Sequence, residues 1–208
     1  KRDIESAAKW FRQAAEQDLG SAQFNLAMMH LRGEAVKQDE DAAIGLLERA
    51  AAQGHESAEL TIGRLHLAHP DDPERVALAA ELFQRLAEDG NADAQVTLGL
   101  IYTFGQGVEQ DYEEGRFWLT LASNQGSGTA QLNLGNLYVE GFGVERDRIR
   151  AYAWYAISAD HGDSAGKLNR DLLAQELNEI ELTEAQKLAV ELASPMPTST
   201  TERDLQRP

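Results

Sequence analysis

Small and apolar residues recur along this chain at an interval of 36 residues. The interval is marked by Ala22, Ala58, Ala94 and Ala130, and Ala165 follows 35 residues after the last of them. Four places beyond the first four alanines stand the apolar residues Leu26, Ile62, Leu98 and Leu134. Alanine or glycine follows directly, at Ala27, Gly63, Gly99 and Gly135. Repetition of several positions at one interval predicts modules that stack, because no single module buries its own apolar face.

Each module predicts two helices with defined ends. The second helices are expected to begin at Asp39, Asp111 and Asp147, since an aspartate carboxylate accepts hydrogen bonds from the free N–H groups of a first helical turn. Glu114 lies three residues after Asp111 and completes a capping box. Glycines that favour a left-handed backbone are expected just beyond helix C-termini, at Gly54, Gly90, Gly126 and Gly162. Local chemistry therefore specifies both ends of these helices.

A Gly-x-Gly-Val turn separates the two helices of a module. It occupies residues 105–108 and 141–144, with a weaker copy at 33–36. Such glycines would suit a phosphate loop after a strand, but here they recur after predicted helices, so we interpret them as turn residues. The second module lacks these glycines, and there Asp72 is expected to cap a helix that Pro73 begins.

The two ends of the pattern differ from its middle. Residues 3–17 predict a lone second helix. In it, Trp10 occupies the same repeat position, or column, as Leu46, Leu82, Trp118 and Trp154 in the later modules. That column predicts tryptophans in the interior rather than on a surface that stacks on sugars or bases. Near the other end, Thr183 and Gln186 form a capping box and predict a last helix that caps the array.

We therefore expect an all-α fold, a right-handed αα superhelix of four to five modules over residues 1–193. The modules lie near 21–56, 57–92, 93–128 and 129–163, and a capping region covers 164–193. Residues 194–208 lack periodicity and are rich in polar and turn-forming types, which predicts a disordered tail. The sequence begins with Lys1 rather than Met and inside a helical pattern, which predicts a processed or trimmed chain.

Two modules carry a specific signature. Residues 94–111 contain Ala-Gln, Leu-Gly, Tyr, Gly-x-Gly-Val and Asp in order, and residues 130–147 repeat this before Ala-Tyr-Ala-Trp-Tyr at 151–155. The pattern resembles the Sel1-like repeat family, relatives of tetratricopeptide repeats. The resemblance implies an αα superhelix that acts as a non-catalytic adaptor or scaffold in bacterial signalling, secretion or cell-envelope systems. It favours the periplasm or cell envelope, with the cytoplasm as the alternative, and implies no cofactor.

Charge and composition narrow the class of partner. The 208 residues include 35 Asp and Glu against 19 Lys and Arg, a net charge of −16 at pH 7. Such a chain repels phosphate backbones, which argues against nucleic acid and favours a basic or neutral protein or peptide partner. There is no cysteine, so disulfides and thiolate metal sites are excluded. No apolar run approaches the roughly 20 residues needed to span a bilayer.

The first helices are predicted to carry an apolar stripe opposite the face that packs on the second helices. With each anchor alanine numbered zero, the stripe occupies positions 2, 6 and 9. Its members are Phe24, Met28, Leu31, Leu60, Arg64, Leu67, Val96, Leu100, Thr103, Leu132, Asn136 and Val139. We expect the stripe to line a concave groove for a peptide or partner helix, with Arg64, Thr103 and Asn136 orienting the ligand. The alternative is that it packs on the neighbouring module.

Two other functions compete with the adaptor. A structural or oligomerising component of a cell-envelope assembly is favoured if the incomplete first module stacks on another copy. A metal-dependent enzyme would use His66 and His69, three residues apart and close to Asp71 and Asp72. His66 occupies a structural column of the repeat, however, and the two acids precede the proline that begins a helix. The sequence therefore favours capping there, and it predicts no metal site and no catalytic residue.

Overall fold

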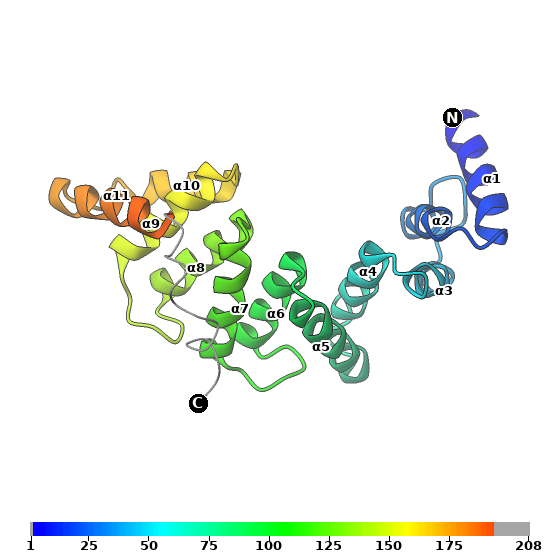
Figure 1. The fold of residues 1–208 in the computed structure, drawn as a ribbon, viewed down its shortest axis with the longest axis horizontal. Helices are drawn as coiled ribbons and strands as arrows, with labels where there is room; N and C mark the ends of the chain where they lie inside the picture. The colour runs from blue at the N-terminus through cyan, green and yellow to red at the C-terminus, as the bar shows by residue number, and fades with distance from the viewer. Residues whose placement is uncertain (1, 194–208) are drawn as a thin grey trace. The chain divides into compact units, whose positions relative to one another are not determined.

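The computed structural model describes residues 2–193, and in this part of the chain all regular secondary structure is α-helical (Figure 1). Its helices are α1 (Arg2–Glu16), α2 (Gly20–Arg32), α3 (Glu40–Ala51), α4 (Glu56–Leu67), α5 (Pro73–Glu88), α6 (Ala92–Phe104), α7 (Tyr112–Asn124), α8 (Gly128–Glu140), α9 (Arg148–Asp160), α10 (Ser164–Leu173) and α11 (Glu179–Ala193). The predicted tail at 194–208 lies outside the described residues. None of the described helices is long and apolar enough to cross a membrane.

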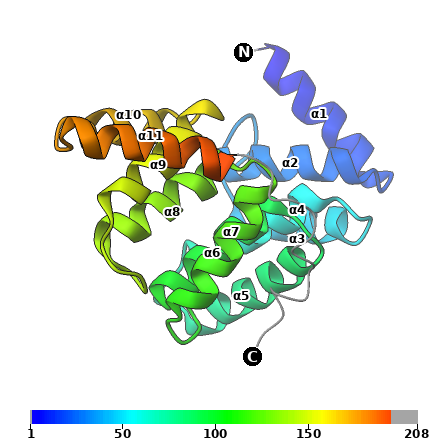
Figure 2. The same ribbon diagram turned by 60° about the vertical axis from the view of Figure 1, so that its left-hand side comes forward.

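The chain divides into two compact units, unit 1 (residues 1–85) and unit 2 (residues 86–208). In unit 1, α2 packs against α1 and α3, and α3 packs against α4. In unit 2, α7 packs against α6 and α8, and α8 packs against α9. Helices α10 and α11 both pack on α9 (Figure 2). Packing between neighbours in sequence is what stacked two-helix modules predict.

Small residues at one position of the first helices let the second helices approach closely. A Cβ added at Gly99 would lie 2.7 Å from Leu119 Cγ and 2.9 Å from the carbonyl oxygen of Gly115, both on α7. Ordinary packing does not allow such distances, so only glycine fits at this crossing. The same contact recurs at the module interval between Gly63 and Phe83, Gly99 and Leu119, and Gly135 and Tyr155.

The predicted aspartate caps are confirmed. The side chains of Asp39, Asp111 and Asp147 each accept a hydrogen bond from a backbone N–H in the first turn of α3, α7 and α9. Asp72 does the same for α5, which begins at Pro73. The glycines predicted just beyond helix ends have positive φ angles: Gly54 79°, Gly90 90°, Gly126 84° and Gly162 87°.

The weaker copy of the glycine turn keeps the turn's backbone. Gly33, Gly105 and Gly141 end α2, α6 and α8 in the left-handed conformation. Two residues later Gly107 and Gly143 again have positive φ, and in the first module Ala35 takes their place at φ 57°. An alanine there adopts a backbone that L side chains disfavour, because the surrounding turn fixes it.

Within two modules, a buried glutamine of the first helix is hydrogen-bonded to a glutamine just beyond the end of the second helix. Gln53 Nε2 donates to Gln23 Oε1 at 2.9 Å, and Gln125 Nε2 donates to Gln95 Oε1 at 2.8 Å. Gln23 and Gln95 are almost completely buried. These bonds satisfy amide groups whose burial would otherwise be costly, so they are part of the fold.

The three tryptophans that share one repeat position differ in burial. Trp118 is buried at 6% exposure and Trp154 is half-buried, as predicted, but Trp10 is 69% exposed. The prediction for Trp10 is wrong because this side chain lies on a face of α1 that no described helix covers. Residues of one column share a position in the repeat, but whether such a residue is buried depends on whether a neighbouring helix covers it.

The last helix begins earlier than predicted. Helix α11 begins at Glu179, and Asn178 accepts the N–H groups of Ile180 and Glu181. Glu181 in turn accepts the N–H of Asn178, so the capping box lies here. Thr183 is inside the helix, where its hydroxyl donates to the carbonyl of Glu179. Residues 178–181 and 183–186 both match the capping-box pattern, and the capping box forms at 178–181.

Candidate functional site

Three side chains at positions 2 and 9 of the predicted stripe are buried between helices. Leu60 and Val96 are 8% exposed, and Thr103 is 2% exposed. The hydroxyl of Thr103 donates to the carbonyl of Gly99 at 2.7 Å, so its polar group is satisfied within α6. These side chains serve the packing of the modules.

The other members of positions 2 and 9 are half-buried. In unit 1, Phe24 stacks on His55 with ring centroids 4.6 Å apart, and Leu31 packs on the same core cluster as Phe24. In unit 2, Leu132 and Val139 pack around the cluster that surrounds Tyr152. Leu67 of unit 1 is half-buried as well. The stripe is thus divided between packing positions and a more open row.

The open row is position 6, occupied by Met28 and Arg64 in unit 1 and by Leu100 and Asn136 in unit 2. Arg64 is exposed, and the other three are half-buried. Asn136 Oδ1 accepts the hydroxyl of Tyr155 at 2.8 Å, which leaves the amide nitrogen of Asn136 as a donor. Burial raises the pKa of Tyr155, so this hydroxyl stays protonated at neutral pH.

A polar column that the sequence analysis missed lies beside position 6. Position 3 holds Asn25 and Thr61 in unit 1 and Thr97 and Asn133 in unit 2. Each side chain donates to the carbonyl four residues earlier, at 2.7, 2.7, 2.9 and 2.8 Å respectively. In the sequence, this column is visible as a recurrence of Asn or Thr at the module interval, whereas the predicted stripe was defined by its apolar residues.

Positions 3, 6 and 10 of the first helices form one face, which we call the outward face. In unit 2, position 10 is Phe104 on α6, a large apolar side chain that is 57% exposed, and Glu140 on α8, which is also exposed. Val96 of α6 shares a core cluster with Ala130 and Leu134 of α8 and with Leu119 of α7. On its first helices, unit 2 therefore presents an exposed apolar side chain as well as amide and hydroxyl groups.

The two histidines considered as metal ligands belong to an ion-pair network in unit 1. Arg75 Nη2 lies 2.7 Å from Glu40 Oε1, and His69 Nε2 lies 2.9 Å from the same oxygen. Arg75 Nε also donates to His66 Nδ1 at 3.2 Å. The hydrogen bond from Arg75 lowers the pKa of Glu40, and burial followed by the charge of Arg75 lowers the pKa of His66. Across residues 2–193 no group of three or more His, Asp or Glu is arranged to hold a metal ion.

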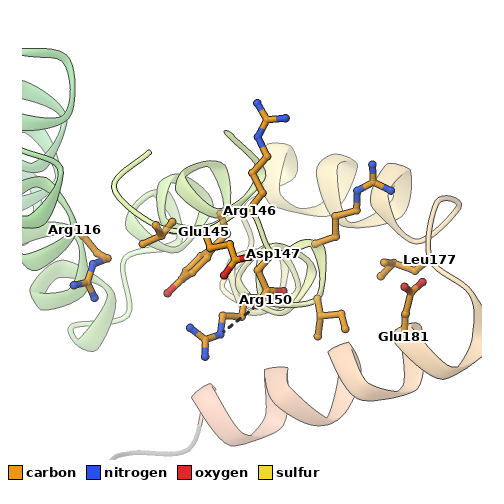
Figure 3. A pocket seen from close by; sticks show the side chains of 11 residues that line it. Arg116, Glu145, Arg146, Asp147, Arg150, Leu177 and Glu181 are labelled. Atoms are coloured by element: carbon orange, nitrogen blue, oxygen red, sulfur yellow. Dashed lines mark hydrogen bonds and ion pairs between the residues drawn. The ribbon is translucent and has the colours of Figure 1, made fainter. Parts of the chain in front are cut away.

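Unit 2 also contains a hollow of about 910 Å³ at the start of α9 (Figure 3). Arg116 of α7 and three arginines of residues 146–150 line it, together with Tyr138 of α8 and Leu177 before α11. The guanidinium of Arg150 lies 5.6 Å from the ring centroid of Tyr138 and 3.4 Å from an oxygen of Asp147. Sequence analysis missed this hollow because three of its arginines alternate with other residues near a helix cap.

Comparison with known proteins identifies the repeat. The family model for the Sel1 repeat matches residues 1–19, 20–55, 71–91, 92–127 and 128–163. The gap at 56–70 coincides with the module that lacks the glycine turn. No curated protein matches the sequence.

Solved structures agree with this match. A protective antigen of uropathogenic Escherichia coli that displays an SLR fold is 30% identical, with a TM-score of 0.76, over 89% of this chain and 40% of the antigen. A Sel1 repeat protein from Oxalobacter formigenes is 29% identical, with a TM-score of 0.71, over 92% of this chain and 80% of that protein. An immunity protein from Pseudomonas aeruginosa shares the fold at 22% identity and a TM-score of 0.56, over 90% of this chain and 74% of that one.

Proposed function

Because the chain belongs to the Sel1 repeat family, whose members are generally non-catalytic protein-interaction modules, we propose that it is an adaptor that binds a partner protein or peptide on its outward face. The observation that carries the proposal is the outward face itself, where an asparagine or threonine recurs at position 3 at the module interval and the side chains at positions 3, 6 and 10 are half-buried or exposed. Position 6, part of the predicted stripe, belongs to this face. A role in binding for the whole stripe stays a prediction.

The polar column supports recognition of a peptide backbone. An asparagine that uses its amide nitrogen on a helix carbonyl keeps its side-chain oxygen as an acceptor, and a threonine hydroxyl keeps its lone pairs. Asn133 of α8 and Thr97 of α6 are held in this way in unit 2. Fixed polar groups lose little conformational entropy when a ligand binds, which favours affinity.

Phe104 supports an apolar anchor beside these groups. Interfaces concentrate their binding energy in a few large side chains, aromatic ones above all, surrounded by polar contacts. Phe104 is exposed at the end of α6, and Leu100 lies one helical turn before it on the same face. The net charge of −16 adds a field that steers a basic partner toward the protein.

The test is a comparison of captured proteins between the native chain and Phe104→Ala/Asn133→Ala. We expect the double variant to lose the proteins that the native chain enriches from bacterial extract, as measured by quantitative mass spectrometry. Neither side chain is buried, so far-ultraviolet circular dichroism should stay unchanged.

The matched control is Ile180→Ala/Thr120→Ala. It removes one exposed apolar side chain from α11 and one polar side chain from α7, both in the same unit. The control is expected to retain the captured proteins. If the outward-face variant retains them too, the binding site lies elsewhere and the proposal fails.

A second candidate function, self-association, is favoured by one observation in unit 1. A hollow of about 510 Å³ between α1 and α2 is lined mostly by apolar side chains, among them Trp10, Phe11 and Leu19. Trp10 and Leu19 are 69% and 54% exposed. Exposed apolar surface of this kind fits a second copy of the chain. Native mass spectrometry of the chain and of Trp10→Ser tests it, because a monomer in both samples excludes self-association.

A further inference from the structure

We propose that the arginine-lined hollow of unit 2 binds an acidic peptide segment in which apolar side chains separate the carboxylates. The site lies at the start of α9 and uses none of the residues assigned to the outward face. A test of this site is therefore independent of the test of the proposed adaptor function.

Positive charge in unit 2 is concentrated at this hollow. Between residues 86 and 193 the lysines and arginines are Arg116, Arg146, Arg148, Arg150, Lys167, Arg170 and Lys187. The four arginines that come first in this list line the hollow. In a chain with a net charge of −16, the lining of this hollow carries one more positive than negative side chain.

Two of the four guanidinium groups form no ion pair within residues 2–193. Arg116 has none, and Arg146 uses its Nε to donate to the backbone carbonyl of Glu140 at 3.1 Å. The other two have weak partners: Arg148 lies 3.7 Å from Glu176, and both of these side chains are more than half exposed. Exposed pairs of this kind contribute little stability, so a ligand carboxylate can compete for them.

The carboxylates at the hollow are mostly engaged in the fold. Asp147 caps α9 through the N–H of Arg150 at 2.9 Å, and Glu181 accepts the N–H of Asn178 at 2.9 Å. Glu145 is exposed at the rim. The lining thus carries four positive and three negative side chains, and two of the negative ones are bound to backbone groups.

The spacing of the arginines favours an extended ligand over a single anion. Figure 3 shows Arg116, Arg146 and Arg150 spread around the start of α9 instead of meeting at one point. The side chains of Val144, Ile149 and Leu177 also line the hollow. Separated guanidinium groups in a lining that also contains apolar side chains match a peptide whose carboxylates alternate with apolar residues.

The overall charge argues against larger polyanions. Nucleic acids and anionic membranes interact with the field of the whole protein, and a net charge of −16 repels them. A short acidic segment meets only the local field of the hollow. The volume of about 910 Å³ is in the range of binding sites for ligands of that size.

The test uses a capped, fluorescein-labelled synthetic peptide in which Glu and Asp alternate with Phe and Leu. Its control replaces every Glu by Gln and every Asp by Asn, which keeps the shape and removes the charge. In fluorescence anisotropy we expect the full chain to bind the acidic peptide, and to bind the amide peptide weaker by about tenfold or more. The variant Arg116→Gln/Arg146→Gln should lose affinity for the acidic peptide to a similar extent.

The charge-matched control variant is Lys167→Gln/Lys187→Gln. It removes the same two positive charges from unit 2 at exposed positions outside the hollow, so it should bind the acidic peptide like the native chain. Circular dichroism establishes that both variants are folded. Inorganic phosphate, added at ionic strength matched with chloride, should not displace the peptide.

Three results would overturn the proposal. The first is no binding of the acidic peptide by the native chain, or equal binding of the amide peptide. The second is an equal loss in the arginine and lysine variants, which would assign binding to the general field. The third is displacement by phosphate, or stronger binding of phosphatidylglycerol vesicles or an oligonucleotide through the same arginines, which would identify a different ligand class.

Discussion

At the residue scale, the glycines of this chain differ in whether the surrounding atoms leave room for a side chain. Gly45 lies inside α3, and a Cβ built on it meets no atom within 4 Å. A Cβ built on Gly115 of α7 would lie 2.9 Å from the carbonyl oxygen of Gly99 and 3.1 Å from the N–H nitrogen of Thr103. Backbone atoms cannot move aside as a flexible side chain can, so the crossing of α6 and α7 depends on Gly115.

These two glycines give a matched prediction. Gly115→Ala should lower the free energy of unfolding by about 1–3 kcal/mol, because overpacking forces the two helices apart. Gly45→Ala should raise it by about 0.5–1 kcal/mol, because alanine favours a helix interior. Urea unfolding followed by circular dichroism measures both. A neutral Gly115→Ala would mean that the helices adjust without cost.

His66 makes stability depend on pH. Burial and the charge of Arg75 lower its pKa below 6.5, while Glu40, Glu48 and Asp72 act in the opposite direction with smaller effect. The unfolded chain therefore binds a proton more readily than the folded one. The contribution of His66 is complete above pH 6.5 and is lost as the pH falls through its folded pKa.

We expect the urea midpoint of unit 1 to fall on acidification from about pH 7.5 to about pH 5.5, and to fall less in His66→Gln. Over this range Glu40, whose pKa is lowered from 4.5, stays ionised and contributes no change. Urea unfolding followed by circular dichroism measures the midpoint of both proteins at each pH. Parallel pH profiles for the two proteins would show that His66 is not responsible.

At the scale of the element, short-range chemistry sets where helices begin. Asp111 accepts the N–H groups of Glu113 at 2.9 Å and Glu114 at 3.0 Å and so satisfies two donors at the start of α7. The sequence predicted this cap and those of α3, α5 and α9, because capping needs only residues within one turn. It placed the start of α11 wrongly because two overlapping segments fit the same rule.

Asp111→Ala should reduce the free energy of unfolding by about 1 kcal/mol, since the cap and its favourable charge at the helix N-terminus are both lost. Asp111→Asn, which keeps an acceptor oxygen, is the comparison and should cost less. Chemical unfolding of the three proteins measures the difference. Equal losses in the two variants would show that charge, and not the hydrogen bond, is what stabilises α7.

The candidate site illustrates the limit of reasoning from elements alone. A helical wheel placed Val96, Thr103 and Asn136 on one stripe, yet Thr103 is buried against α7 and Asn136 is bonded to Tyr155. Their surroundings depend on residues up to 19 positions away in the sequence. Periodicity gives the angle of a side chain about its helix axis, but only the neighbouring helices decide whether that angle faces solvent.

At the scale of the whole molecule, the excess of acidic residues opposes the folded state. A net charge of −16 brings like charges together on folding, and the ion pairs that offset it are mostly exposed. We expect the thermal midpoint to rise by several degrees when sodium chloride is raised from low concentration to about 0.2 M, where the screening length falls below about 10 Å. Differential scanning calorimetry measures this. A midpoint that falls with added salt would show that attractive pairs outweigh the repulsion.

The sequence by itself determined the module, its interval, its helix caps and turns, and the family, because each of these follows from contacts within a module or from repetition of it. It also determined the sign of the overall charge. Only the tertiary structure decided which members of the stripe are covered, that Trp10 is exposed, that Gln23 bonds to Gln53, and that arginines from α7 and the start of α9 share one hollow. The physical reason is that burial and proximity depend on helices distant in the chain, and a spacing pattern carries no record of which helix lies opposite.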